Sequence, residues 1–336
     1  MVLEKKLVEE VACWLKLYDD GSVDRTWSGP PEAKFMAQPI QPHEEFIDGV
    51  AVRDLTINAD SDLAIRIYKP EKKAEDLEKF PILVHFHGGG FCISEPEWFM
   101  YYNIYTRLVR TARAVCVSVK MRRAPEHRLP AACDDCYSVL LWLQAVARGK
   151  LSEPWLEAEA DFKRVFFIGD SSGGNLVHEV AARAGNEEIE PLQLAGGIPI
   201  HPGFIRAERS RSELENESDS PFLTLEMVDK FMFFALPVGS TKDHPITCPM
   251  GSAAPPLSGL KLPPFLLVVA EKDLIRDTEM EYYEAMKKAG KDIELLINTG
   301  MGHSFYLNKI AIDADPNTAS QTEHLITEIT NFIKRH

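Results

Sequence analysis

Three residue types that together can transfer an acyl group occur along the chain in the order serine, aspartate and histidine. Ser171 stands in the segment Gly-Asp-Ser-Ser-Gly (169–173), between an apolar run at 165–168 and helix-forming residues at 175–184. This pattern predicts a strand, a sharp turn and a helix, with the serine hydroxyl exposed at the carboxyl edge of a sheet. The flanking glycines are needed because a Cβ there would clash with the neighbouring strand or helix. A glycine-rich turn without chemistry is the alternative interpretation of the pentapeptide alone.

A candidate acid and a candidate base follow Ser171 along the chain, each shortly after a predicted strand. Asp273 comes soon after an apolar run at 264–270, so it is expected at the same sheet edge. Asp277 is the rival acid, although its position suits a cap for the next helix. His303 lies in a glycine-flanked loop after the last predicted strand. This order is that of a serine hydrolase, in which the imidazole takes the serine proton and the carboxylate orients the imidazole.

Three consecutive glycines, Gly88, Gly89 and Gly90, follow an apolar run at 82–86. Their bare backbone N–H groups could stabilise the negative oxygen of a tetrahedral intermediate, and loss of one such donor typically costs about 3–4 kcal/mol. The run matches neither Gly-x-Gly-x-x-Gly nor a lysine-bearing phosphate loop. A flexible linker would not stand between a buried strand and the aromatic stretch at 91–105. The sequence therefore predicts an oxyanion hole in this loop.

The remaining histidines and the cysteines carry less weight as catalytic groups. His87 is expected to hold the glycine loop in shape. His127 and His201 stand beside prolines, and His178 lies inside the helix after the serine. A Cys-x-x-Cys pair at 133–136 has no second pair to complete a zinc site, and its segment continues as an apolar helix. No metal or cofactor is expected.

Composition limits the classes of protein and of partner. The chain has 336 residues, of which 45% are hydrophobic and 26% charged, enough for one large α/β domain or two smaller ones. Its net charge of −14 opposes binding to nucleic acids and to anionic membranes. No run approaches the roughly 20 apolar residues of a membrane span, and the first residues lack an apolar signal core. A cytoplasmic location is therefore expected, with no nucleic-acid partner.

The first elements of the chain, within residues 1–45, precede the predicted main sheet. Residues 5–18 place apolar side chains at helical spacing, which predicts an amphipathic helix. Prolines make residues 28–45 an irregular, extended crossing. Alternating runs at 50–57 and 63–68 then predict two antiparallel strands. We expect residues 1–45 to form part of a cap or lid.

From residue 81 onward apolar strands alternate with helices, which predicts a mostly parallel sheet with helices on both faces. The strands are expected at 82–86, 114–119, 165–168, 194–200, 264–270 and 293–297, and the helices at 98–110, 131–146, 175–184, 279–289 and 322–334. Residues 203–250 interrupt this rhythm with a charged run at 206–219 and a Phe- and Met-rich helix at 224–236. We predict that this insertion is a second cap element and that residues 1–336 form a single domain.

Five motifs in a fixed order carry a resemblance to a known family. They are His-Gly-Gly-Gly (87–90), Ala-Pro-Glu-His-Arg-Leu-Pro-Ala-Ala (124–132), Gly-Asp-Ser-Ser-Gly-Gly-Asn (169–175), Asp-Leu-Ile-Arg-Asp (273–277) and Gly-His-Ser-Phe (302–305). Over nearly its whole length the chain resembles the plant carboxylesterases of the hormone-sensitive-lipase type, and among them most closely the group of the tobacco hypersensitivity-related carboxylesterase. The resemblance implies an α/β-hydrolase fold with a helical cap from 1–45 and 203–250, and no cofactor.

The resemblance also implies a role for each candidate residue. The nucleophile would be Ser171, the base His303, the partner of that base Asp273, and the oxyanion donors Gly88, Gly89, Gly90 and the N–H of Ser172. Ser172 replaces the alanine of many members, which preserves the backbone donor. Met-Arg-Arg (121–123) replaces the usual Tyr-Arg-Leu, and the sequence leaves open whether Arg122 and Arg123 face the substrate or the solvent.

These observations predict a serine carboxylesterase that hydrolyses a small ester or specialised metabolite through an acyl-enzyme intermediate. Phe91, Phe231 and Tyr306 are expected to line an apolar pocket. One alternative is a lyase, cyclase or dehydratase that uses the same triad. Another is a small-molecule receptor, because the gibberellin receptors resemble this family, although they have lost the catalytic histidine that is present here as His303. The protein is expected to be a monomer or a homodimer.

Overall fold

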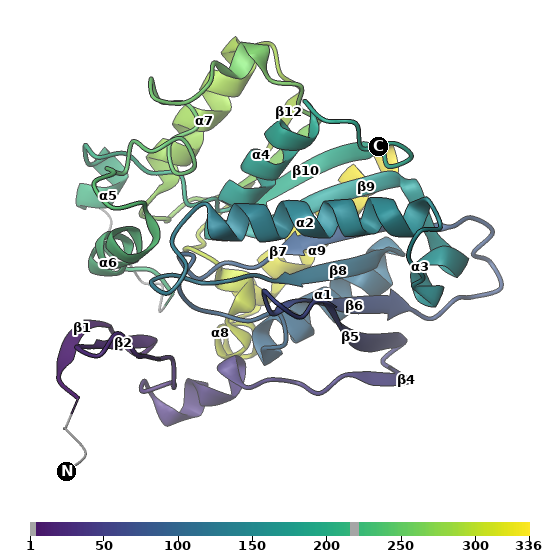
Figure 1. The fold of residues 1–336 in the computed structure, drawn as a ribbon, viewed down its shortest axis with the longest axis horizontal. Coiled ribbons are helices and arrows are strands. Elements are labelled where there is room, and N and C mark those ends of the chain that lie inside the picture. The colour runs from purple at the N-terminus through teal and green to yellow at the C-terminus, as the bar shows by residue number, and fades with distance from the viewer. Residues whose placement is uncertain (1–4, 216–221) are drawn as a thin grey trace.

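The fold is built around a nine-stranded sheet, in a computed structural model that describes residues 5–215 and 222–336 (Figure 1). The strand order is β12-β11-β10-β9-β7-β8-β6-β5-β4. The strands are β4 (His43–Ile47), β5 (Val50–Asn58), β6 (Leu63–Pro70), β7 (Phe80–Phe86), β8 (Val115–Lys120), β9 (Ala160–Asp170), β10 (Leu194–Ile200), β11 (Phe265–Ala270) and β12 (Ile293–Asn298). The pairs from β8 through β7 to β12 are parallel, and those joining β4, β5, β6 and β8 are antiparallel. The predicted mostly parallel sheet with an antiparallel start is confirmed.

Helices cover both faces of the sheet because its central strands are apolar on both sides. All residues of β7 are buried, which requires cover above and below. Helices α1 (Phe99–Ala112) and α9 (Pro316–Arg335) pack together on one face. Helices α2 (Ala131–Ala147) and α4 (Ser172–Ala184) pack together on the other face, with α3 (Pro154–Glu159) beside α2 (Figure 1). Helix α7 (Arg276–Lys288) packs on β11 and β12.

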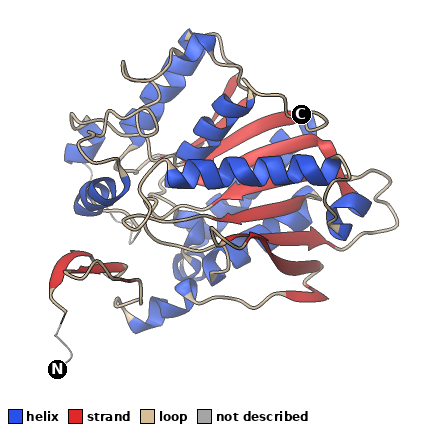
Figure 2. Cartoon of the chain, in the orientation of Figure 1, coloured by secondary structure: helices blue, strands red, loops and turns tan. Residues whose placement is uncertain are grey.

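The N-terminal segment differs from its prediction. Residues 5–18 do not form a helix but a hairpin of β1 (Leu7–Val11) and β2 (Leu15–Tyr18), to which β3 (Val23–Asp24) adds a third strand. Figure 2 shows this small sheet apart from the main one. Its turn contains Cys13 at φ 68°, and the indole of Trp14 stacks on that of Trp98 with ring centroids 6.0 Å apart. The helical spacing of the apolar residues was therefore overridden by packing against a distant segment. The 3₁₀ helix η1 (Pro31–Ala37) follows.

The insertion after β10 carries α5 (Arg211–Glu215) and α6 (Leu225–Ala235). Helix α6 confirms the predicted helix, whereas residues 216–219 of the predicted charged run lie outside the described residues. The Lys230 ammonium of α6 donates to the backbone oxygen of Glu10 at 2.6 Å and pairs with Glu9 at 2.9 Å. The insertion and the N-terminal sheet therefore contact each other, and we refer to them together as the cap.

Short elements complete the chain. They are η2 (Leu257–Gly259), η3 (Phe305–Leu307) and α8 (Lys309–Ala314). Within residues 5–215 and 222–336, none of the helices combines the length and the apolar character that crossing a bilayer would require.

Candidate active site

Ser171 occupies a tight turn between β9 and α4. Its backbone has φ 51° and ψ −124°, a conformation that L-residues rarely adopt and that marks strain at functional sites. The turn is possible because α4 lies directly against β7: a Cβ on Gly173 would stand 1.9 Å from the backbone oxygen of Phe86. The Ser171 N–H donates to the oxygen of Ile200 at 3.0 Å, which fixes the turn against β10. The serine side chain consequently lines a cavity at the carboxyl edge of the sheet.

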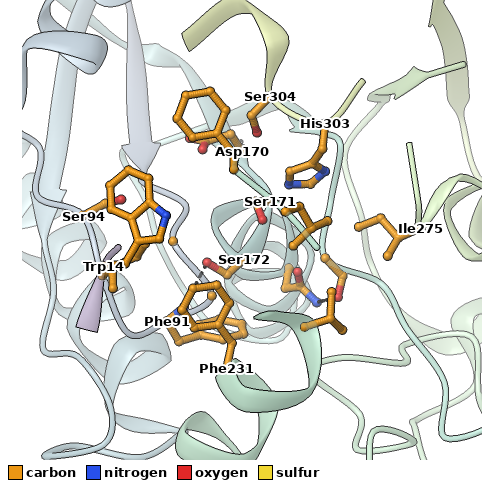
Figure 3. Close-up of a pocket in the computed structure, with 18 of the residues that line it drawn as sticks. Trp14, Phe91, Ser94, Asp170, Ser171, Ser172, Phe231, Ile275, His303 and Ser304 are labelled. Carbon is orange, nitrogen blue, oxygen red and sulfur yellow. Dashed lines mark hydrogen bonds between the residues drawn. The ribbon is translucent and has the colours of Figure 1, made fainter. Parts of the chain in front are cut away.

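Asp273 and His303 come together at this edge. Asp273 follows β11, His303 follows β12, and the His303 Nδ1–H donates to the Asp273 Oδ2 at 2.6 Å. Both side chains are buried. This bond fixes the ring tautomer, and it leaves the other ring nitrogen on the side of Ser171 (Figure 3). Asp277 lies elsewhere, because its carboxylate accepts the Ser212 N–H at 2.9 Å.

The glycine loop brings two of its three predicted donors to the cavity. Gly89 and Gly90 line it, as does Ser172 at the start of α4. Within the described part of the chain, the N–H groups of Gly89 and Gly90 donate to no other protein group. Gly88 departs from the prediction, because its N–H donates to the Tyr101 hydroxyl at 3.0 Å and it does not line the cavity. Gly89, Gly90 and Ser172 are therefore the positions at which an oxyanion could be held.

A buried polar network lies beneath the glycine loop. The Tyr101 hydroxyl accepts from Gly88 and donates to the Asp170 carboxylate at 3.2 Å. Burial, reinforced by the Asp170 charge, raises the pKa of Tyr101 well above its usual value, so the phenol keeps its proton. The His87 Nδ1–H donates to the oxygen of Gly88 at 2.9 Å, and burial lowers the His87 pKa to about 4. These bonds hold the loop in shape through the neutral side chains of Tyr101 and His87, with the Asp170 carboxylate as an acceptor.

The cavity over Ser171 is largely apolar and has a volume of about 690 Å³, counting space open to solvent. The cap contributes Trp14 and Phe231, and the glycine loop contributes Phe91 (Figure 3). The described lining residues include neither lysine nor arginine. Tyr306 departs from the prediction: it is buried and does not line the cavity, because η3 turns its ring toward His201, at a centroid distance of 5.9 Å.

His201 is a residue of the site that the sequence did not reveal. It follows β10, is completely buried, and its Nδ1 accepts the N–H of Ser304, the neighbour of His303, at 3.0 Å. Burial lowers the His201 pKa to about 4, so the ring is neutral and can accept. One ligand atom each of His201, Asp273 and His303 lie within 4.8 Å of one another. Because Asp273 and His303 already bond to each other, the group suits proton transfer better than metal binding.

Arg122 and Arg123 lie outside the cavity, which answers the question that the sequence left open. The Arg122 guanidinium pairs with Asp135 at 2.7 Å. The Arg123 guanidinium pairs with Glu95 at 2.6 Å and donates to the oxygen of Ser94 at 3.2 Å. Arg122 therefore braces the start of α2, and Arg123 holds the segment that follows the glycine loop.

Known proteins are similar to this chain in sequence and in fold. Residues 83–307 match a family described as alpha/beta hydrolase fold. The chain belongs to this family. Among solved structures, the hydrolase superposes on a bacterial heroin esterase with a TM-score of 0.68 at 25% identity, over 85% of each chain. It superposes on an esterase of Pyrobaculum calidifontis with a TM-score of 0.67 at 27% identity, over 84% of each chain.

Plant proteins are similar to this hydrolase over most of their length. The probable carboxylesterase 13 of Arabidopsis thaliana is 30% identical and covers 99% of both chains. The gibberellin receptor GID1C of Arabidopsis thaliana is 37% identical over 82% of this chain and 80% of its own. The chloroplastic tuliposide A-converting enzyme 1 of Tulipa gesneriana is 32% identical over 93% of this chain and 76% of its own.

These similarities confirm the fold class and the resemblance to plant carboxylesterases of the hormone-sensitive-lipase type. The hydrolase is thus an esterase-like member of the family. The narrower likeness to the tobacco protein stays a prediction. So does the cytoplasmic location, since the tulip relative is chloroplastic.

Proposed function

We propose that the protein is a serine carboxylesterase that hydrolyses a small, neutral ester. The observation that carries the proposal is the buried 2.6 Å bond between His303 Nδ1 and Asp273 Oδ2, at the wall of a cavity that Ser171 also lines. A histidine held in this tautomer by a buried carboxylate is the arrangement that activates a serine hydroxyl.

The reaction would proceed in two acyl transfers. The Ser171 oxygen attacks the ester carbonyl while His303 accepts the hydroxyl proton, and the N–H groups of Gly89, Gly90 and Ser172 stabilise the resulting oxyanion. His303 then gives its proton to the leaving alkoxide, so an alcohol departs and an acyl-enzyme remains. Water attacks this ester while His303 accepts one of its protons, and His303 then gives that proton to the Ser171 oxygen as the bond to the acyl group breaks and the acid is released. Asp273 stays ionised throughout.

The wall of the cavity supports a neutral, apolar substrate. An anionic ligand would find no lysine or arginine among the described lining residues, and an unpaired buried charge is costly. Phe91, Phe231 and Trp14 would instead contact apolar acyl or alcohol groups.

The first test is Ser171→Ala with a short-chain aryl ester. We expect kcat to fall by at least about a thousandfold, because the nucleophile is lost and only binding and oxyanion donors remain. Asp277→Asn serves as the matched control, since Asp277 bonds to Ser212 rather than to His303. Unchanged hydrolysis by Ser171→Ala would contradict the mechanism.

Two related functions are separated by what the protein does to its ligand. The same triad could instead serve a lyase, cyclase or dehydratase reaction, and one relative is named as a tuliposide A-converting enzyme. Product mass decides this, because hydrolysis adds water to the substrate and cyclisation or elimination does not. The similarity to a gibberellin receptor favours considering a binding protein. Tight binding of a small molecule without turnover would support that function over the esterase.

A further inference from the structure

We propose that Arg25, in the N-terminal cap, is a positioning residue for the oxyanion loop. Its guanidinium fixes the segment after Gly89 and Gly90, so that the cap, once seated, also completes the catalytic site. The inference rests on the proposed esterase function, because the N–H groups that Arg25 would position act as oxyanion donors only in that reaction.

Arg25 bonds to three separate parts of the loop region. Its Nε–H donates to the backbone oxygen of Cys92 at 2.7 Å. Its Nη2–H donates to the backbone oxygen of Ala124 at 2.9 Å. Both terminal nitrogens donate to the Glu126 carboxylate, at 2.8 and 2.5 Å. Although burial raises the pKa of Glu126, the bonds from Arg25 lower it overall, so the carboxylate stays charged.

Phe91 connects the contacts of Arg25 to the oxyanion donors Gly89 and Gly90. Phe91 follows Gly90 and has φ 62°, a left-handed conformation that a non-glycine residue holds only under constraint. Its N–H donates to the Ser172 hydroxyl at 3.1 Å, and its oxygen accepts the Ala124 N–H at 2.9 Å. The Arg25 guanidinium donates to the oxygens of both Ala124 and Cys92. One planar group of the N-terminal segment therefore holds the residue that follows Phe91 and the residue that bonds to the Phe91 oxygen.

Only the guanidinium fork can make all of these bonds at once. A lysine at position 25 would keep the positive charge beside Glu126, but one ammonium on a flexible stem cannot hold two carbonyls and a carboxylate in fixed directions. The alternative role of Arg25 is simply to attach the cap. The chain offers a control for that role, because Lys230 of α6 also holds the N-terminal sheet, through Glu9 and Glu10, without touching the loop.

The experiment compares Arg25→Met, Arg25→Lys and Lys230→Met on a short-chain aryl ester. We expect both Arg25 variants to lose roughly tenfold to hundredfold in kcat, because small displacements of oxyanion donors are costly, with KM changed by less than about threefold. Lys230→Met should keep kcat within about twofold. A rise in KM with kcat retained in Arg25→Met, or an equal loss of kcat in Lys230→Met, would overturn the proposal.

A second measurement does not depend on turnover. Hydrogen–deuterium exchange of amides in residues 88–94 should be faster in Arg25→Met than in the wild type and in Lys230→Met, while exchange in β7 stays the same. Unchanged exchange in 88–94 would overturn the role of Arg25 even in an active enzyme. Absence of Ser171-dependent turnover in the wild type would instead refute the proposed function, and the exchange result would still decide the role of Arg25.

Discussion

Glu279 on α7 is a carboxyl group that the fold buries at a cost. It is fully buried, and neither oxygen has a hydrogen-bond partner within the described residues. Burial first, and then the nearby Asp273 charge, raise the Glu279 pKa well above 4.5. The folded protein therefore keeps a proton that the unfolded chain releases. Such a group contributes stability below the unfolded pKa, and that contribution is lost as pH rises toward the folded pKa.

Glu279→Gln should consequently stabilise the protein increasingly as pH rises. The gain in unfolding free energy over the wild type should grow between about pH 5 and about pH 8, by at most about 1.4 kcal/mol per pH unit. Urea unfolding at several pH values measures this gain, and Glu284→Gln on the exposed side of the same helix is the control. Wild-type and Glu279→Gln stabilities that run parallel with pH would contradict the prediction.

At this scale the sequence predicted three residues that the structure brings together at one edge of the sheet, and it missed residues that contact their neighbours. Ser171, Asp273 and His303 could be found because each follows an apolar strand or stands among glycines. The roles of His201 and Arg25 could not be found, because they consist of bonds to Ser304, Cys92 and Ala124, far away along the chain. Gly88 and Tyr306 were assigned to the cavity because sequence does not show which way a loop amide or a 3₁₀ side chain points.

The element on which the site depends is the junction of β9 and α4. A Cβ on Gly173 would meet backbone atoms of Phe86 and His87 at 1.9 to 2.9 Å. Gly173→Ala should therefore destabilise the protein by about 3 kcal/mol or more, because neighbouring backbone cannot move aside as a flexible side chain would. Thermal unfolding measures the loss. Gly259→Ala, where a Cβ meets nothing within 4 Å, should leave the melting temperature nearly unchanged.

Secondary structure could be predicted where one strong local signal dominated. Long apolar runs identified β7 to β12, and the longer helices α1, α2, α4, α6 and α7 were also predicted, whereas the short helices α3 and α5 were not. The signal failed in the N-terminal sheet, since the hairpin β1–β2 owes its form to Trp14 packing on Trp98. It also failed for β4, an edge strand whose side chains are mostly exposed and so show no apolar pattern. Edge and cap elements depend on distant partners, which local spacing does not encode.

Over the whole molecule, three buried histidines make the fold sensitive to acid. Burial lowers the pKa values of His87, His178 and His201 from 6.5 to about 4. Between these pH values the three imidazoles are protonated in the unfolded chain but not in the folded protein. The free energy of unfolding therefore falls as pH drops from 6.5 toward 4.

His178→Gln should reduce this sensitivity without touching the proposed catalytic groups. The loss of unfolding free energy between about pH 7 and about pH 5 should be smaller than in the wild type by about 2 kcal/mol, because one of the histidines no longer titrates. Denaturant unfolding at the two pH values measures the difference. The exposed His324, replaced by Gln, should show the wild-type pH dependence. An unchanged loss in His178→Gln would contradict the assignment.

The overall architecture followed from the alternation of strands and helices and from the family motifs, and it is confirmed. The single domain over 1–336, the monomer or homodimer and the absence of a cofactor stay predictions. The oligomeric state depends on surface contacts, and the cofactor requirement depends on ligands. Neither is specified by the spacing of apolar and polar residues along the chain.

The aromatic contact of the cap has a spectroscopic consequence. Of the five tryptophans, Trp14 and Trp27 belong to the N-terminal segment and meet at a centroid distance of 4.5 Å, and Trp98 stacks on Trp14. Three of the five indoles therefore lie at the contact between the N-terminal segment and the rest of the protein. A fluorescence melting curve would follow detachment of the cap, while far-ultraviolet circular dichroism would follow the sheet and helices beneath it.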